Sequence, residues 1–312
     1  MELKLRSLSE LEKLETEELE RECSRLRVRF KPVEELTFAD DFLFGALMYR
    51  REVCAGVIER LLGIRAGKIT YPELQKVISP FYDSKGIRLD VLARDGKTLY
   101  NIEMQTAAHA SLPLRMRYYQ GLLDMDLLMK GQDYGDLCQS YVIFICRADP
   151  FDRGLPAYTF ENTCLEDSSL KLGDKSRKVL YNVSAWESDC DGERRSLLRY
   201  IDSGDATSAF TRRLEELSQE VKGSNKFRRQ YMMQNIYIND AIYQGREMGR
   251  AEGIATGMER GISLGEEQAT RRNILSFYKN NVPVSLIASS VGKTEAEVQE
   301  IIRLGQTETP SC

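Results

Sequence analysis

The stretch that decides the fold covers residues 87–105 and reads IRLDVLARDGKTLYNIEMQ. Apolar residues alternate with other residues on both sides of Asp95 and Gly96, and this period of two is typical of β-strands. Asp-Gly between two alternating segments is a strong signal for a two-residue hairpin turn. The stretch therefore predicts two antiparallel strands that turn at Asp95 and Gly96, with residue 90 opposite residue 101.

The segments around this hairpin predict helices and further strands. Residues 141–146 read YVIFIC, a continuous apolar run typical of a strand covered on both faces. Helical periodicity is present over residues 37–48, 53–62, 112–130 and 193–230. We expect Thr37 to cap the first of these helices and Gly63 to end the second. Short strands are expected near 157–160 and 178–183. The order of hairpin, helix and buried strand predicts a mixed sheet flanked by helices, and therefore an α/β fold.

Composition and punctuation divide the chain into four parts. We expect an amphipathic helix over residues 1–30, which either packs on its own domain or serves as a partner-binding arm. The α/β domain is expected over residues 31–235, and a glycine-repeat helical linker over residues 236–270. A small tri-helical unit that resembles a helix-turn-helix is expected over residues 271–312.

The composition excludes several classes of protein. The chain has 312 residues, of which 42% are hydrophobic and 29% charged, as in ordinary globular proteins. A net charge of −4 gives no general positive field, so any nucleic acid must be bound by local patches. His109 is the single histidine, which excludes two-histidine zinc sites and nucleases that need a histidine pair. Metal chemistry is therefore expected through carboxylates.

The sequence also predicts a cytoplasmic location. No stretch approaches the roughly 20 consecutive apolar residues that span a bilayer, so we expect no membrane segment. The chain begins with charged residues rather than with the pattern of a secretory signal. Its seven cysteines are odd in number and lack Cys-x-x-Cys spacing, which is typical of reduced thiols.

Two acids of the predicted hairpin fall on one face of the sheet. In the expected register Asp90 lies diagonal to Glu103, with Cβ atoms about 7 Å apart, and Gln105 shares the face of Glu103. Carboxylates at this separation can share Mg²⁺ or Mn²⁺, which prefer oxygen ligands. Spacing alone favours two solvated surface acids, but the apolar neighbours of both residues point to a metal site.

The chain resembles a known family at this point. An aspartate, a gap and then Glu-x-Lys on adjacent strands is the pattern of the PD-(D/E)XK nucleases. The chain resembles one branch, the Rpn family of recombination-promoting nucleases, which are also described as transposases. The resemblance covers residues 30–265. It rests on five blocks in order: FADDFLF at 38–44, GIRLDV at 86–91, IEMQ at 102–105, RMRYY at 115–119 and YVIFIC at 141–146.

The resemblance implies a restriction-endonuclease-like core and Mg²⁺- or Mn²⁺-dependent cleavage of DNA phosphodiesters. Asp90 matches the metal-binding aspartate of the family, and Glu103 matches its second acidic ligand. Gln105 stands where the wider superfamily has a lysine, so it would orient water or phosphate by hydrogen bonds rather than by charge. Asp41 matches a helix acid that often completes the metal site, although an acid at a helix N-terminus also has an electrostatic explanation.

Arg115 and His109 are further polar candidates for the same site. Arg115 and Tyr119 are four residues apart and share one face of the helix predicted for 112–130. Arg115 either reaches a scissile phosphate or lies along the helix surface. His109 falls in an Ala- and Ser-rich stretch, where a polar loop residue is favoured over a general acid or base.

The C-terminal part carries an internal period. Six glycines recur every four residues, at positions 245, 249, 253, 257, 261 and 265. Together they cost a helix about 6 kcal/mol relative to alanine, yet small residues at this spacing let two helices approach closely. We expect a homo-oligomer through this helix, with a flexible linker as the alternative. In the last unit Glu295, Glu297 and Glu300 disfavour DNA reading and favour a protein contact.

Two hypotheses of function follow. The first is a Mg²⁺-dependent DNA endonuclease in which Asp90 and Glu103 hold the metal and Gln105, Asp41 and Arg115 assist. The second is a DNA-binding or assembly protein built on a catalytically inactive nuclease-like core.

Overall fold

The computed structural model describes residues 8–26, 28–70, 73–78, 87–96, 98–107, 110–128 and 130–307. Position 109, for which a polar loop residue was predicted, lies outside the described residues, as does the glycine at position 86. The chain divides into two compact units, Met1–Asn235 and Ile236–Cys312, which are considered one at a time.

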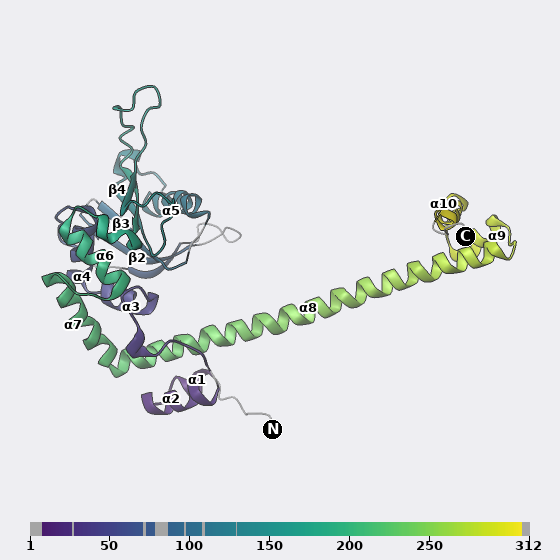
Figure 1. Ribbon diagram of the computed structural model, residues 1–312, viewed down its shortest axis with the longest axis horizontal. Coiled ribbons are helices and arrows are strands. Elements are labelled where there is room, and N and C mark those ends of the chain that lie inside the picture. Colours follow the sequence, from purple (N-terminus) through teal and green to yellow (C-terminus); the bar gives the residue numbers. More distant parts are fainter. Residues whose placement is uncertain are drawn as a thin grey trace. The chain divides into compact units, whose positions relative to one another are not determined.

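The first unit is built on a mixed six-stranded sheet with the strand order β1-β2-β3-β4-β6-β5 (Figure 1). Its strands are β1 (Glu73–Ile78), β2 (Ile87–Asp95), β3 (Thr98–Gln105), β4 (Gln139–Cys146), β5 (Ala157–Phe160) and β6 (Ser176–Asn182). β2 runs antiparallel to both β1 and β3. β3, β4 and β6 are parallel to one another, and β5 is antiparallel to β6. The buried run predicted as a strand is β4, near the middle of the sheet. The α/β fold with a mixed sheet is confirmed.

Helices cover both faces of the sheet and create two apolar cores. The larger core lies under α3 (Asp41–Met48), α4 (Arg51–Leu62), α6 (Gly192–Ser203), α7 (Ala209–Gly223) and the start of α8 (Asn225–Lys279). The smaller core lies under α5 (Leu112–Leu127), on the opposite side of the sheet in Figure 1. Strand residues alternate between the two cores: Tyr100, Ile102 and Met104 of β3 face the larger core, whereas Leu99 faces the smaller. The sheet is therefore buried on both faces in its middle.

The hairpin predicted from residues 87–105 is present, but its register differs from the prediction. Asp95 pairs with Thr98, so Asp95 belongs to the strand and not to the turn. Gly96 has a φ of 53°, which a glycine adopts without strain. Asp95 stays in the strand because its carboxylate accepts a hydrogen bond from the N–H of Gly67 and its backbone forms a bridge with Ile69. Residue 90 is consequently placed opposite residue 103 and not opposite residue 101.

The side chains of β2 change from one face of the sheet to the other near Asp90. Leu89 packs in the smaller core, yet Val91, two residues later, packs in the larger one. Residues two apart in a regular strand share a face, so the backbone turns over at Asp90. Gln75 of the neighbouring β1 lies opposite Asp90 in the register and has a φ of 50°, in the left-handed region. The sheet is therefore kinked across both strands at the level of Asp90.

Several helix ends follow the sequence, and one differs. Gly63 ends α4 with a φ of 65°, as expected. Thr37 does not cap α3, because the helix begins only at Asp41 with Asp40 in the N-cap position. The N–H and hydroxyl of Thr37 instead donate to the carboxylate of Asp40, at 2.6 and 2.9 Å. This local turn uses the side chain that the sequence suggested as a cap.

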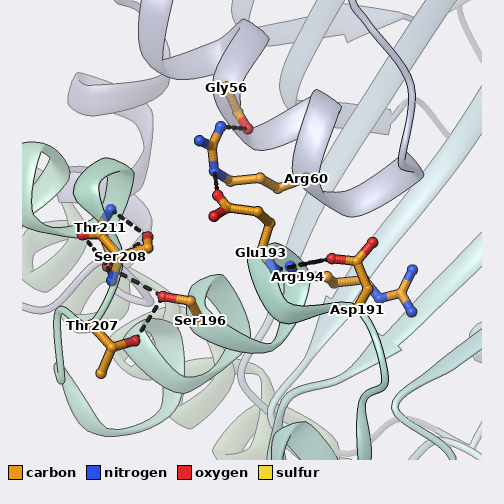
Figure 2. Close-up of polar contacts among 9 residues, drawn as sticks. All are labelled: Gly56, Arg60, Asp191, Glu193, Arg194, Ser196, Thr207, Ser208 and Thr211. Carbon is orange, nitrogen blue, oxygen red and sulfur yellow. Dashed lines mark hydrogen bonds and ion pairs between the residues drawn. The ribbon is translucent and has the colours of Figure 1, made fainter.

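Polar contacts tie α6 to α4 (Figure 2). Arg60 of α4 donates to the carboxylate of Glu193 at 2.9 Å and to the carbonyl oxygen of Gly56 at 3.0 Å. Asp191 caps α6 by accepting hydrogen bonds from the backbone N–H groups of Glu193 and Arg194. α7 begins with a capping box between Ser208 and Thr211. These helices pack against one face of the sheet in the larger core.

The N-terminal segment contains two helices where one was expected. α1 spans Leu8–Leu11 and α2 spans Thr16–Arg25, and Glu15 in extended conformation separates them. Glu17 and Glu18 lie in the first turn of α2, where the helix dipole favours acids, and this favours a new helix start there. The described part of the first unit also contains the 3₁₀ helices η1 (Val33–Glu35), η2 (Tyr134–Asp136) and η3 (Val183–Ser188).

The glycine repeat lies in one continuous helix. α8 runs from Asn225 to Lys279, and its residues 241–268 are all exposed. A Cβ added at any of the six repeat glycines would meet open space, so nothing in the described chain covers that stripe. Among the described residues, no helix has both the length and the apolar character needed to cross a membrane.

The second unit ends in a small helical cluster. The end of α8 packs with α9 (Val284–Val291) and α10 (Glu295–Thr307), so the first of three expected short helices is the last part of α8. The core consists of Ile274, Ile287, Ala288, Val298 and Ile302. The expected capping box is present: Thr294 N–H donates to Glu297 at 2.8 Å, and Glu297 N–H donates to Thr294 at 3.3 Å.

Candidate functional site

Asp90 and Glu103 lie side by side where β2 leaves β3. The backbone pairing between these strands ends at Val91 and Ile102. Beyond it, the N–H of Asp90 donates to Glu103 Oε1 at 3.1 Å, and the N–H of Met104 donates to Asp90 Oδ2 at 3.0 Å. Each carboxylate thus replaces a backbone acceptor of the adjacent strand. In the register the two acids lie opposite each other just beyond the last backbone pair, rather than in the predicted diagonal placement.

Burial dominates the electrostatics of this pair. The side chain of Glu103 is only 1% exposed. Burial, and then the charge of Asp90, raise the pKa of Glu103 to about 8, against the opposing effects of the Asp90 N–H and Arg115. Burial also raises the pKa of Asp90, although the hydrogen bond from Met104 N–H lowers it. A buried carboxylate and a half-buried one, each in contact with the other's strand, therefore favour a proton or a bound cation.

Arg115 of α5 brings a positive charge to the pair. Its Nη2 donates to Glu103 Oε2 at 3.3 Å, its Nη1 donates to Gln105 Oε1 at 2.8 Å, and its Nε donates to the hydroxyl of Tyr119 at 2.9 Å. The guanidinium also lies over the rings of Tyr119 and Phe144, 5.0 and 5.1 Å from their centroids. The side chain remains 32% exposed. The shared helix face of Arg115 and Tyr119, predicted from their spacing, is confirmed.

Gln105 is fixed at both ends of its amide. Its Oε1 accepts from Arg115, and its Nε2 donates to the carbonyl oxygen of Ala107 at 2.6 Å. A guanidinium can only donate and a carbonyl oxygen can only accept, so these two partners determine which way the amide points. The structure therefore joins Gln105 to Glu103 through Arg115.

Asp41 lies within electrostatic reach of the pair but does not touch it. The charge of Asp41 raises the pKa of Asp90, and the charge of Arg88 lowers the pKa of both residues. Burial raises the pKa of Asp41 itself. No hydrogen bond joins Asp41 to Asp90 or Glu103 in the described part of the chain. Of the five residues predicted for the site, four are joined by hydrogen bonds: Asp90, Glu103, Gln105 and Arg115. Asp41 forms no hydrogen bond with them among the described residues.

Sequence reasoning missed two residues of this site. Asn101 is completely buried on the α5 side of β3, and it lies near enough to lower the pKa of Glu103. Neither Nδ2 nor Oδ1 of Asn101 meets hydrogen-bond geometry with another group among the described residues. Its position two residues before Glu103 was the available signal. Phe144 comes from β4, and no local pattern links it to Arg115.

The carboxylates of Asp90 and Glu103 suit a hard divalent cation that needs few ligands from the protein. Mg²⁺ is commonly held by one or two carboxylates together with waters and substrate phosphate, and Asp90 and Glu103 supply two. A cation between them would offset the charge of Asp90, which after burial raises the pKa of Glu103. Within the described ranges, no group of three or more Asp, Glu, His or Cys side chains is placed to hold a metal. The protein would therefore leave most coordination positions to water and substrate.

Comparison with known proteins gives no relative: no family model, no curated protein and no solved structure matches the chain.

Proposed function

We propose that the protein is a metal-dependent DNA endonuclease with a restriction-endonuclease-like core, of the recombination-promoting type that its sequence motifs resemble. One observation carries the proposal. Two carboxylates, Asp90 and Glu103, meet in an opening between two strands, and a cation from α5 adjoins them. This is the arrangement that phosphodiester hydrolysis needs, because negative charge grows on the phosphate as the bond breaks.

Each residue has a distinct role in this proposal. Asp90 and Glu103 would hold Mg²⁺ or Mn²⁺, and the bound ion would supply Lewis acidity towards water and phosphate. Arg115, always protonated, faces the same site from α5. Asp41 and Arg88 adjust the charge beside Asp90. DNA is the proposed substrate, bound through local basic residues because the net charge of the chain is −4.

A plasmid assay tests the proposal directly. Supercoiled DNA should be nicked or linearised with Mg²⁺ or Mn²⁺ and remain intact with EDTA. Asp90→Ala and Glu103→Ala should each abolish cleavage, because either change removes one of two metal ligands. Asp126→Ala is a matched control, since this acid of α5 forms an ion pair with Lys76 instead. Undiminished cleavage by the purified Asp90→Ala, Glu103→Ala double variant would exclude these residues as the site.

The exposed part of α8 supports a second proposal, which concerns assembly. Residues 241–268 have no covering side chains, and the glycine stripe leaves room for a close partner. We propose that this helix mediates homo-oligomer formation. If the plasmid assay shows DNA binding without cleavage, an assembly protein with an inactive nuclease-like core becomes the better description.

A further inference from the structure

We propose that Arg115 supplies the catalytic positive charge of this site and that Gln105 and Tyr119 are positioning residues that hold its guanidinium. The inference rests on the proposed nuclease function and specifies how its site stabilises the phosphate. It assigns Gln105 a different task from orienting water or phosphate itself.

The Gln105 amide has a defined direction. Its carbonyl oxygen, the end that points into the site, accepts from Arg115 Nη1 at 2.8 Å. Its Nε2 points the other way, to the carbonyl oxygen of Ala107 at 2.6 Å. An acceptor facing the site cannot stabilise a negatively charged phosphate, but it can hold a donor that does. The charge that a lysine at position 105 would bring is therefore present in the neighbouring guanidinium.

Arg115 has more N–H donors than it has partners among the described residues. A guanidinium has five N–H groups. In the described part of the chain, three of them have partners: Tyr119, Gln105 and Glu103. Two N–H groups remain, on a side chain that is 32% exposed. A phosphate oxygen is a suitable acceptor for such a pair.

The guanidinium of Arg115 is held by contacts on several sides. Its Nε is fixed by the hydroxyl of Tyr119, and the rings of Tyr119 and Phe144 lie within 5.1 Å of its central carbon. Its bond to Glu103 is the longest of the three, at 3.3 Å. A metal that engages the Glu103 carboxylate would compete with that bond alone. Arg115 would keep its position through Gln105 and Tyr119, with its charge directed at the substrate.

A double-mutant cycle on the cleavage rate separates the two roles of Gln105. Arg115→Met should slow single-turnover cleavage of plasmid DNA by about 10²- to 10³-fold, as expected for one lost stabilising donor group. Gln105→Ala should cost about tenfold, because the guanidinium is then misplaced rather than absent. The combined variant should be no slower than Arg115→Met alone, because Gln105 acts through Arg115. Losses that multiply would overturn the positioning role.

A charge exchange gives the second measurement. In the Gln105→Lys, Arg115→Gln variant the cation moves across the 2.8 Å contact and stays at the same site. Cleavage should return to within about tenfold of wild type, the remainder reflecting the lost guanidinium fork. Arg117→Met is the matched control, because this exposed arginine lies two residues further along α5 on another face. No recovery in a folded exchange variant would contradict the charge role.

Binding of Mn²⁺ provides a third measurement, which reports the positive charge that Arg115 places beside Glu103. Arg115→Met should bind Mn²⁺ about five- to tenfold more tightly in calorimetry, because a positive charge next to Glu103 is gone. Tighter binding with slower cleavage supports the proposal. A wild-type protein that neither binds Mn²⁺ nor cleaves DNA removes the nuclease function as well. If the wild type cleaves DNA and Arg115→Met cleaves it equally fast, the nuclease function stands and only the role of Arg115 is refuted.

Discussion

Replacing Glu103 by glutamine should stabilise the metal-free protein while it abolishes cleavage. In the folded chain the pKa of Glu103 is raised from 4.5 to about 8, first by burial and then by the charge of Asp90. The folded state therefore binds a proton more tightly than the unfolded state does. The stability that protonated Glu103 contributes is complete below pH 4.5 and is lost as the pH rises towards 8.

The magnitude follows from the interval between these values. At pH 7 the loss covers the 2.5 units between 4.5 and 7, and at about 1.4 kcal/mol per unit this amounts to about 3 kcal/mol. Glutamine remains neutral, and its carbonyl oxygen can still accept from the N–H of Asp90. Part of the gain is offset because Arg115 loses its charged partner. We expect Glu103→Gln to be more stable than wild type at pH 7.5 and similar to it at pH 4.5.

The assay uses the single tryptophan of the chain, Trp186. This residue packs against the larger core, so its fluorescence reports unfolding of the first unit. Urea unfolding in EDTA should be compared at the two pH values for wild type, Glu103→Gln and the control Glu216→Gln. The side chain of Glu216 is 66% exposed, so its replacement should change little. Equal stabilities of Glu103→Gln and wild type at pH 7.5 would refute the reasoning.

Three further predictions concern stability and assembly. Arg194→Met should cost about 3–5 kcal/mol of unfolding free energy in urea, because the side chain of Asp189 is 0% exposed and would lose its bidentate partner; a cost below 1 kcal/mol would contradict it. Gly253→Leu with Gly257→Leu should shift the protein towards monomer in light scattering, although both changes favour the helix; an unchanged mass, or a wild type already monomeric at tens of micromolar, would leave the linker alternative standing. Gly63→Ala should lower thermal stability, by about 1 kcal/mol, because a φ of 65° disfavours a side chain even in open space; an unaltered melting temperature would argue against that strain.

The sequence was sufficient for the elements of the fold but not for their exact pairing. Alternation over residues 87–105 predicted both hairpin strands, and the apolar run at 141–146 predicted β4. The register was wrong because local turn chemistry favoured Asp95 in the turn. Its actual place depends on Gly67 and Ile69, more than twenty residues earlier, which hold it in β2. Contacts of this range leave no local signature.

The site shows the same division. The period of two placed Glu103 and Gln105 on one face, and helix spacing paired Arg115 with Tyr119. The contact between Arg115 and Gln105 was not foreseen, because it depends on how closely α5 packs against β3. The turnover of β2 at Asp90 also escaped prediction, since alternation alone extends a regular strand through that residue.

The way the two acids close the gap between β2 and β3 makes two amide protons natural reporters of the site. The N–H groups of Asp90 and Met104 are held by carboxylate oxygens and not by the backbone of the facing strand. A ligand that draws those oxygens away leaves both protons to exchange with solvent, whereas amides within the neighbouring ladder keep their protection. Hydrogen exchange at two positions could thus register occupancy of the site in a protein that is performing no reaction.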